Sequence, residues 1–275
     1  MPSDVVVIIG AGGIGQAIAR RQGAGRTILL ADHSESALAA AREAMEAVGH
    51  AVSARQADVS SREAVHALAR AAAELGPVVN VVNAAGVIQA PPAAILAVNL
   101  VGTALVFEEF GDVIAPGGAG LVISSMAGHM PPPLDLETAR LLGQTPADEL
   151  LALPVLSEQA VPDSGAAFAI SKQANHARAQ AAAVTWGDRG ARVNSLSPGI
   201  ILTPLVREEM ASPGAAEHYQ QAIATSAVGR IGTVDEIATA AAFLLGPDAG
   251  FITGTDLLID GGVIAALRAG RLNLP

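Results

Sequence analysis

The sequence predicts a single-domain α/β fold, a doubly wound, seven-stranded parallel sheet with helices on both faces. Seven short runs rich in Val, Ile and Leu alternate with alanine-rich stretches that suit helices. The runs show little polar alternation, as expected of strands buried on both faces of a parallel sheet. Because each strand–helix–strand unit crosses over in the right-handed sense, such a chain winds helices onto both sides of the sheet. The length of 275 residues suits one domain of this kind.

The strands and helices are expected in strict alternation. Ser34 and Ser61 are good N-caps, and Glu63 and Asp235 favour the first turns of their helices. The expected strands are Val5–Ile9, Thr27–Ala31, Val52–Gln56, Val78–Val82, Leu121–Ser124, Ala191–Leu196 and Asp256–Ile259. The expected helices are Gly13–Arg21, Ser34–Val48, Ser61–Leu75, Ala94–Phe110, Ala166–Trp186 and Val234–Leu245.

Two segments, 126–165 and 200–227, interrupt this alternation. The first contains Pro131-Pro132-Pro133 and several short amphipathic pieces, and the second follows the sixth strand. Strand signals resume after each segment, so neither is expected to link separate domains. We therefore expect residues 1–275 to form one domain, with both segments standing over one edge of the sheet.

The composition excludes several classes of protein. Hydrophobic residues make up 51% and charged residues 15%, which is enough apolar material for a core. The net charge is −10 without a basic run, so neither nucleic acid nor an anionic membrane is an expected partner. There is no cysteine, and the N-terminus has no signal-peptide pattern. We expect a cytoplasmic protein, and no residue pattern predicts a bound metal.

A glycine-rich loop predicts a dinucleotide site of the Rossmann type. Gly10-Ala11-Gly12-Gly13-Ile14-Gly15 follows the first strand and opens a helix. Gly10 allows the tight turn, Gly12 lets the backbone approach a pyrophosphate, and Gly15 lets the helix pack on the strand. The helix N-terminus then faces the anion. A glycine-rich turn without function is the alternative, which the strand before and the helix after make less attractive.

The end of the second strand predicts which dinucleotide binds. Asp32 stands 22 positions after Gly10, where a carboxylate can accept hydrogen bonds from both adenosine ribose hydroxyls and repel a 2′-phosphate. His33, rather than an arginine, follows it. The sequence therefore favours NAD over NADP. The alternative is that Asp32 only caps the following turn.

Further motifs follow in order along the chain. They are Asp58-Val59, Asn83-Ala84-Ala85-Gly86, Asn99, Ser124-Ser125, Ser171-Lys172, Pro198-Gly199-Ile200-Ile201-Leu202-Thr203, Gly229-Arg230 and Asp260-Gly261-Gly262. As an ordered set they are similar to the motifs of the short-chain dehydrogenase/reductase family, over nearly the whole chain. Relative to that family the first loop is one residue shorter, and Ile9 stands where a threonine is usual.

The resemblance implies hydride transfer between a nicotinamide and a carbonyl or alcohol carbon. It places the serine that hydrogen-bonds the substrate oxygen at Ser125, the lysine that holds the nicotinamide ribose at Lys172, and the asparagine of the proton path at Asn99. It implies further cofactor contacts at Asp58, Val59, Asn83, Ala84, Ala85, Lys172, Pro198, Gly199, Ile201 and Thr203.

The position of the family's catalytic tyrosine is Phe168. Phenylalanine has nearly the shape of tyrosine but no hydroxyl, and loss of general acid/base help typically costs about 10²–10⁴ in rate. We therefore expect this form to be inactive or strongly impaired. Tyr219, the only tyrosine, lies far along the chain, and His129 is the loop histidine nearest in sequence to Ser125.

Two explanations of Phe168 stay open. One is a tyrosine-to-phenylalanine change made in an otherwise ordinary enzyme, which the presence of Ser125, Lys172 and Asn99 favours. The other is a homologue without catalysis that binds dinucleotide as a sensor or scaffold. The first implies an NAD(H)-dependent enzyme that interconverts a bulky, largely apolar secondary alcohol and its ketone.

The 126–165 segment resembles the long insertion of bacterial 3α-hydroxysteroid dehydrogenase/carbonyl reductases. It is rich in leucine and methionine, so it is expected either to form an apolar wall on the substrate side or to reshape subunit contacts. Residues 200–227 are expected to form a lid over the substrate. The resemblance also implies a homodimer or homotetramer.

Overall fold

A parallel seven-stranded sheet forms the centre of the computed structural model, which describes residues 3–211 and 213–272. The strand order is β3-β2-β1-β4-β5-β6-β7, and every described strand pair is parallel. The strands are β1 (Val5–Ile9), β2 (Thr27–Asp32), β3 (Ala51–Gln56), β4 (Val78–Asn83), β5 (Ile114–Ile123), β6 (Arg192–Pro198) and β7 (Asp256–Ile259). This order confirms the predicted doubly wound sheet.

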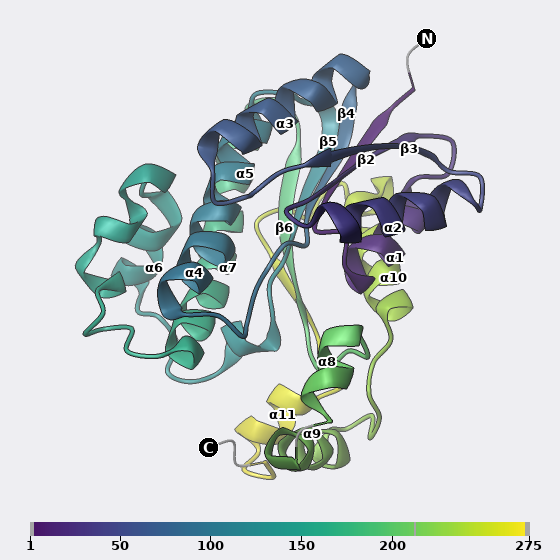
Figure 1. Ribbon diagram of the computed structural model, residues 1–275. Coiled ribbons are helices and arrows are strands. Elements are labelled where there is room, and N and C mark those ends of the chain that lie inside the picture. The colour runs from purple at the N-terminus through teal and green to yellow at the C-terminus, as the bar shows by residue number, and fades with distance from the viewer. Residues whose placement is uncertain (1–2, 212, 273–275) are drawn as a thin grey trace.

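Helices cover both faces of the sheet (Figure 1). One layer contains α1 (Gly13–Gln22), α2 (Glu35–Glu46) and α10 (Val234–Leu245). The opposite layer contains α3 (Arg62–Leu75), α4 (Pro92–Ile95), α5 (Gly102–Gly111) and α7 (Ser164–Gly187). The remaining helices are α6 (Leu136–Gln144), α8 (Pro204–Glu209), α9 (Pro213–Thr225) and α11 (Val263–Arg268).

The alternation of side chains along each strand divides the core into two parts. In β1, Val5, Val7 and Ile9 pack in one buried cluster, and Val6 and Ile8 pack in the other. All five side chains are fully buried. Successive residues of a strand point to opposite faces, so an unbroken apolar run is the pattern that a two-sided core requires.

The structure differs from the predicted elements in two places. Strand β5 begins at Ile114, seven residues before the expected start, because two glycines at 117 and 118 hid its first half. The expected helix 94–110 is a continuous helix in which the π-helical segment η1 (Leu96–Val101) separates α4 from α5. Such π-helical turns are frequently found at functional sites.

The 126–165 segment packs on the outer side of α5 and α7. Helix α6 lies beside α7, at the edge of the molecule away from α8 and α9 (Figure 1). Three buried side chains of the 126–165 segment, Leu142, Leu150 and Leu156, belong to the core cluster on that face of the sheet. Most of the segment therefore covers α5 and α7, and its first residues, Met126 and Ala127, lie at the second cavity described below.

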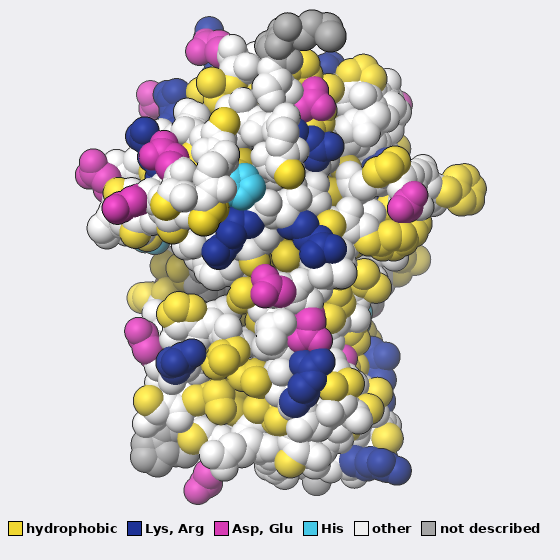
Figure 2. Space-filling view, turned by 90° about the vertical axis from the view of Figure 1, so that its right-hand side faces the viewer, with side chains coloured by type: hydrophobic (Ala, Val, Ile, Leu, Met, Phe, Trp, Pro, Cys, Tyr) yellow, Lys and Arg dark blue, Asp and Glu magenta, His cyan; other side chains and the backbone are white. Residues whose placement is uncertain are grey.

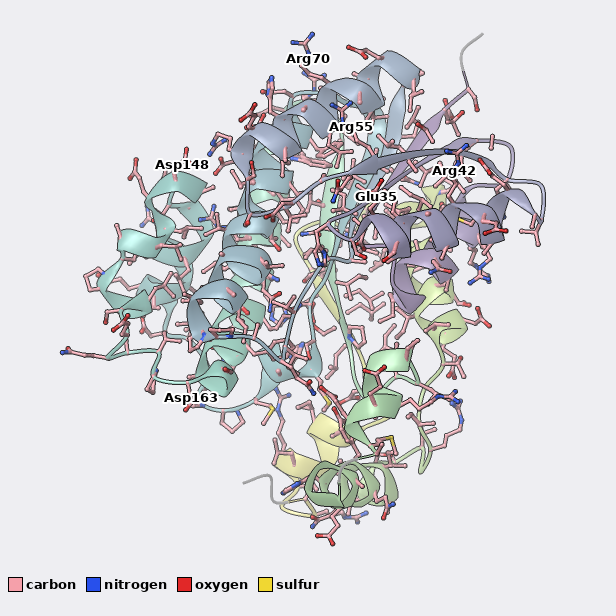
Figure 3. All side chains as sticks on the ribbon, in the orientation of Figure 1. Glu35, Arg42, Arg55, Arg70, Asp148 and Asp163 are labelled. Carbon is pink, nitrogen blue, oxygen red and sulfur yellow. The ribbon has the colours of Figure 1, made fainter. Side chains whose placement is uncertain are left out.

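A cluster of charged side chains fixes this segment to α3. Arg62 donates to Glu108 and Glu109 of α5 at 2.7 Å and to Asp148 at 2.9 Å. Asp148, labelled in Figure 3, lies in the short turn η3 (Ala147–Ala152) of the segment. These three carboxylates raise the pKa of Arg62 above its ordinary value. The segment is thus held by buried leucines on one side and by ion pairs on the other.

The helical stretch Pro92–Gly111 is long and apolar enough to cross a membrane by length and composition. Most of its apolar side chains are buried inside this protein, where they pack between the sheet and α7. A buried core helix can be as long and as apolar as a membrane-spanning one. The burial of this stretch therefore explains its composition.

Substitutions at two adjacent leucines test how firmly the 126–165 segment is anchored. Leu150 is fully buried, whereas the side chain of Leu151 is 50% exposed. We expect Leu150→Ala to lower the free energy of unfolding by about 2–5 kcal/mol, because it removes a buried side chain and leaves a cavity. Leu151→Ala should change it by less than about 0.5 kcal/mol. Urea denaturation measures both, and equal effects would contradict the described packing.

Candidate functional site

Two neighbouring cavities form one groove over the carboxyl ends of the strands. The first has a volume of about 290 Å³ and the second of about 400 Å³. Ala84, Ala85, Gly86 and Val87, which follow β4, line both cavities. In open α/β sheets ligands bind at this end of the strands, where the strand order reverses, as it does here between β1 and β4.

The glycine loop brings three backbones together at the start of the groove. Gly10 has φ +96°, and a Cβ atom there would lie 2.6 Å from the backbone of Ala84. A Cβ atom on Gly15 would lie 1.9 Å from the carbonyl oxygen of Gly10. By contrast, a Cβ atom on Gly12 would meet nothing within 4 Å, because Gly12 faces the first cavity. These positions agree with the three roles expected of the glycines.

Asp32 lies at the same cavity and also orders the loop around it. Its Oδ2 accepts a hydrogen bond from the Ala11 N–H at 2.8 Å, and its Oδ1 accepts one from the Ser34 N–H at 2.9 Å. His33 lines the cavity beside it, with Nδ1 3.2 Å from Oδ1. Asp32 therefore caps the turn, and its carboxylate still borders the space where an adenosine ribose would lie.

Of the other residues predicted to contact the cofactor near Asp32, some line the first cavity and one is buried beneath it. Asp58, Val59, Ala84 and Ala85 line the first cavity. Asn83 does not line it, because its side chain is 1% exposed and lies beneath the groove. Its Nδ2 donates to the Thr103 hydroxyl at 3.2 Å and its Oδ1 accepts from the Ala85 N–H at 3.2 Å, so Asn83 shapes the turn rather than touching a ligand.

Ser125, Phe168 and Lys172 line the second cavity together. Lys172 is the only lysine of the chain, and its side chain is buried. Its Nζ donates a hydrogen bond to the Ile123 carbonyl at 3.2 Å and lies 5.4 Å from the centre of the Phe168 ring. Burial lowers the pKa of Lys172 to about 8. The Ser125 hydroxyl accepts from the Ala127 N–H at 3.2 Å, which begins the turn η2 (Met126–His129).

Asn99 occupies the π-helical segment behind the groove. Its side chain is 1% exposed and makes two hydrogen bonds with Val87, accepting from the N–H at 2.9 Å and donating to the carbonyl at 2.8 Å. Asn99 therefore fixes the backbone that lines both cavities. A Cβ atom on Gly86 would lie 3.2 Å from Asn99 Oδ1 and 3.6 Å from Lys172 Nζ, so the two side chains meet around this glycine.

The loop after β6 completes the second cavity. Ile14 of the glycine loop lines it too, as do Pro198, Gly199, Ile201 and Thr203. Val206 and Glu209 of α8 and Tyr219 of α9 add to its lining, which supports a lid role for this part of residues 200–227. From the 126–165 segment, only Met126 and Ala127 line the cavity within the described residues.

Tyr219 lies closer to the site than its sequence position suggested. It shares the second cavity with Phe168, and its hydroxyl donates to Glu209. Burial and Glu209 raise the pKa of Tyr219 above its ordinary value, so its proton is held tightly. Glu209 also accepts from Gln89 at 3.1 Å, which connects α8 to the loop after β4. No local sequence pattern predicts this position, because only the return of α9 over the groove brings Tyr219 there.

His129 does not line the cavity within the described structure. Its Nε2 lies 2.6 Å from Asp256 Oδ2, and Asp256 does not line that cavity either. His129 is therefore not positioned to replace the proton-transfer group that Phe168 lacks.

The groove fits a dinucleotide on the observations above. The glycine loop borders both cavities, a carboxylate lies at one end of the groove and a buried ammonium lies at the other. The N-terminus of α1 faces the cradle, where backbone N–H groups attract a pyrophosphate.

The burial of Lys172 predicts a pH dependence of stability. The pKa of Lys172 is about 8 in the folded chain and about 10.4 in an unfolded one. Between these values only the unfolded chain holds the proton, so the free energy of unfolding should rise with pH, by about 2–3 kcal/mol from pH 8 to 10. Lys172→Met should lack this rise. Denaturation at several pH values measures both, and parallel profiles would refute the assignment.

Comparisons with known proteins agree with this geometry. A family described as short chain dehydrogenase matches residues 4–135, and one described as Enoyl-(Acyl carrier protein) reductase matches residues 145–264. The short-chain dehydrogenase/reductase bsc3 of Alternaria brassicicola is 41% identical over 271 residues, which cover 97% of this chain and 98% of that protein.

Two further proteins extend the comparison. The 3beta-hydroxysteroid dehydrogenase 1 of Eggerthella lenta is 31% identical, over 96% of this chain and 94% of its own. The crystal structure of levodione reductase superposes with a TM-score of 0.78 at 26% identity, covering 96% of this chain and 98% of that one. The chain therefore belongs to the short-chain dehydrogenase/reductase family, oxidoreductases that act on alcohols and ketones with a nicotinamide dinucleotide.

Proposed function

We propose that the chain is an NAD(H)-dependent oxidoreductase for a bulky, largely apolar secondary alcohol and its ketone, with its proton transfer impaired by Phe168. The observation that carries this proposal is the second cavity, which Ser125, Phe168 and Lys172 line together with residues of α8 and α9. Apolar side chains such as Ile88, Ile200 and Val206 make up much of the remaining wall. A relative of 31% identity is named for a hydroxysteroid, which is a substrate of this kind.

The choice of NAD rests on Asp32. Its carboxylate borders the first cavity, next to His33 and without an arginine among the lining residues that the structure describes there. A carboxylate accepts hydrogen bonds from ribose hydroxyls and repels a 2′-phosphate. The structure holds this side chain in place through two backbone N–H groups, so it is positioned before the cofactor arrives.

Each residue at the second cavity would have a separate role in the reaction. The bound nicotinamide accepts or donates the hydride. The Ser125 hydroxyl holds the substrate oxygen, and Lys172 holds the nicotinamide ribose. Asn99 keeps the backbone of Val87 in place under the cofactor. Phe168 fills the remaining position next to Lys172 without a group that can exchange a proton with the substrate oxygen.

A second candidate function follows from the same phenylalanine. The chain could bind the dinucleotide without turnover, as a sensor or scaffold. Phe168 favours this function, whereas Ser125, Lys172 and Asn99 favour catalysis because each keeps a defined place at the groove. The two functions make different predictions for a chain in which the hydroxyl is restored.

Phe168→Tyr separates them. We expect NADH formation from bulky secondary alcohols to rise by about 10²–10⁴ over the original chain, because the new hydroxyl lies beside the buried Lys172 ammonium. Phe168→Leu is the matched control and should not gain activity. Adding Ser125→Ala to Phe168→Tyr should remove most of the gain. An inactive Phe168→Tyr chain that still binds NADH would favour the non-catalytic function.

Asp32→Ala tests the cofactor preference. Loss of the carboxylate should weaken NADH binding relative to NADPH binding, and the ratio of the two Kd values should change by about 10–100-fold. Because Asp32 also orders Ala11 and Ser34, both affinities can fall. The ratio is therefore the quantity to measure, by fluorescence titration with each cofactor. An unchanged ratio would show that Asp32 only caps the turn.

A further inference from the structure

Three side chains from distant parts of the sequence converge below the turn that follows Ser125. They are His129 of η2, His176 of α7 and Asp256, the first residue of β7. His129 Nε2 lies 2.6 Å from Asp256 Oδ2, and His176 Nε2 lies 3.3 Å from Asp256 Oδ1. The two imidazole rings lie 4.9 Å apart at an angle of 48°. The two histidines thus lie against the two oxygens of one carboxylate.

The three side chains are mostly shielded from solvent. The exposed fractions are 22% for His129, 17% for His176 and 10% for Asp256. The cluster is therefore mostly withdrawn from water but can still be reached from solvent. It lies outside both cavities of the groove, since no described lining residue of either belongs to it.

Two serines of the neighbouring strand β6 hold the Asp256 carboxylate. Ser195 of β6 pairs with Asp256 in the sheet register, and its hydroxyl donates to Asp256 Oδ1 at 2.6 Å. The Ser197 hydroxyl donates to the same oxygen at 2.9 Å. Oδ1 is thus occupied by the two serines, while Oδ2 faces His129. Hydrogen bonds of this kind orient the carboxylate ligand in protein metal sites.

We propose that His129, His176 and Asp256 form a binding site for one divalent transition-metal ion, with zinc as the preferred ion. Two imidazole nitrogens and one carboxylate oxygen are ligands that zinc prefers, and a water molecule completes its four-coordinate shell. One ligand atom from each residue lies within 4.8 Å of the others. In a tetrahedral zinc site with bonds of about 2.0–2.1 Å, ligand atoms lie about 3.3 Å apart, so only small side-chain movements are needed.

The proton balance of binding is simple. In the present arrangement His129 Nε2 lies 2.6 Å from Asp256 Oδ2, whereas His176 Nε2 lies 2.9 Å from the Ser197 hydroxyl and 3.3 Å from Asp256 Oδ1. To bind the ion, each neutral imidazole carries its ring proton on Nδ1, and the Nε2 lone pair faces the metal. Asp256 Oδ2 exchanges its hydrogen bond with His129 for a bond to the ion. No oxidant, reductant or leaving group takes part.

One negative and one positive side chain determine the charge that a bound cation would experience. Asp256 supplies a negative charge, and the buried Lys172 lies one helical turn before His176 on α7. The ion must therefore bind against this ammonium, and Asp256 supplies the compensating charge. Asp256→Asn should for this reason weaken binding at least as much as loss of either histidine.

The ion would join three elements that carry the site. His129 follows Ser125 by four residues, and His176 follows Lys172 by four residues on α7. A bond from the metal to each would fix the serine turn against the lysine helix and anchor both to β7. We therefore assign the ion a structural role next to the groove, and hydride transfer itself does not pass through it.

Metal titration of the full chain tests the site. After treatment with a chelator, the protein is titrated with zinc chloride by calorimetry, and with cobalt chloride to record the visible absorption of tetrahedral cobalt. We expect one ion per chain with a Kd tighter than about 1 µM. Zinc at 100 times its Kd should raise the midpoint of thermal unfolding by about 5 °C.

Variants distinguish this site from other binding. His129→Gln, His176→Gln and Asp256→Asn should each weaken zinc binding by more than about 100-fold, and Ser197→Ala by about 10-fold. His66→Gln is the matched control, because His66 also pairs with a carboxylate, Glu109 at 2.8 Å, but on the surface. It should bind zinc like the original chain. Circular dichroism establishes that each variant is folded.

Two outcomes would overturn the proposal. One is the lack of a bound ion at micromolar zinc, which would leave the cluster as a metal-free hydrogen-bond network. The other is binding that persists in the three ligand variants, which would place the ion elsewhere. Neither outcome depends on NADH binding or turnover, so the site and the proposed function can fail separately.

Discussion

The close approach of three backbones at Gly10 is the constraint on which the rest of the site depends. Strand β1, the loop after β4 and the first turn of α1 meet there at distances that no Cβ atom would allow. This contact turns the N-terminus of α1 toward the carboxyl ends of the strands. It also places Ala84 and Ala85 where they line both cavities, so that the groove is continuous. A side chain at Gly10 or Gly15 would separate these elements and divide the groove.

Helix α7 is the second organising element, because one of its faces serves two purposes. Phe168, Lys172 and His176 follow one another at intervals of four residues, which places them on the same side of a helix. The first two face the groove, and the third faces β7. Lys172 lies between them in sequence, and burial lowers its pKa, because the ammonium loses the solvation that water would supply.

Much of the fold could be predicted from local patterns, and the exceptions have physical causes. The apolar runs predicted all seven strands, but the glycines at the start of β5 concealed its first half. Leucines at helical spacing predicted that the 126–165 segment is amphipathic. They did not reveal what the leucines cover, because an apolar face packs equally well on a substrate cavity or on a neighbouring helix. In the structure that neighbour is α7.

The sequence by itself determined the parallel sheet, the glycine cradle, the carboxylate at Asp32 and the absence of a hydroxyl at Phe168. Each of these follows from residue type and short spacing, which set the backbone conformation and the local chemistry. Only the tertiary structure decided that Tyr219 lines the second cavity, that Asn83 lies beneath the groove and that His129, His176 and Asp256 converge. These residues lie tens of positions apart, and their proximity depends on how helices pack on the sheet, which no local pattern encodes.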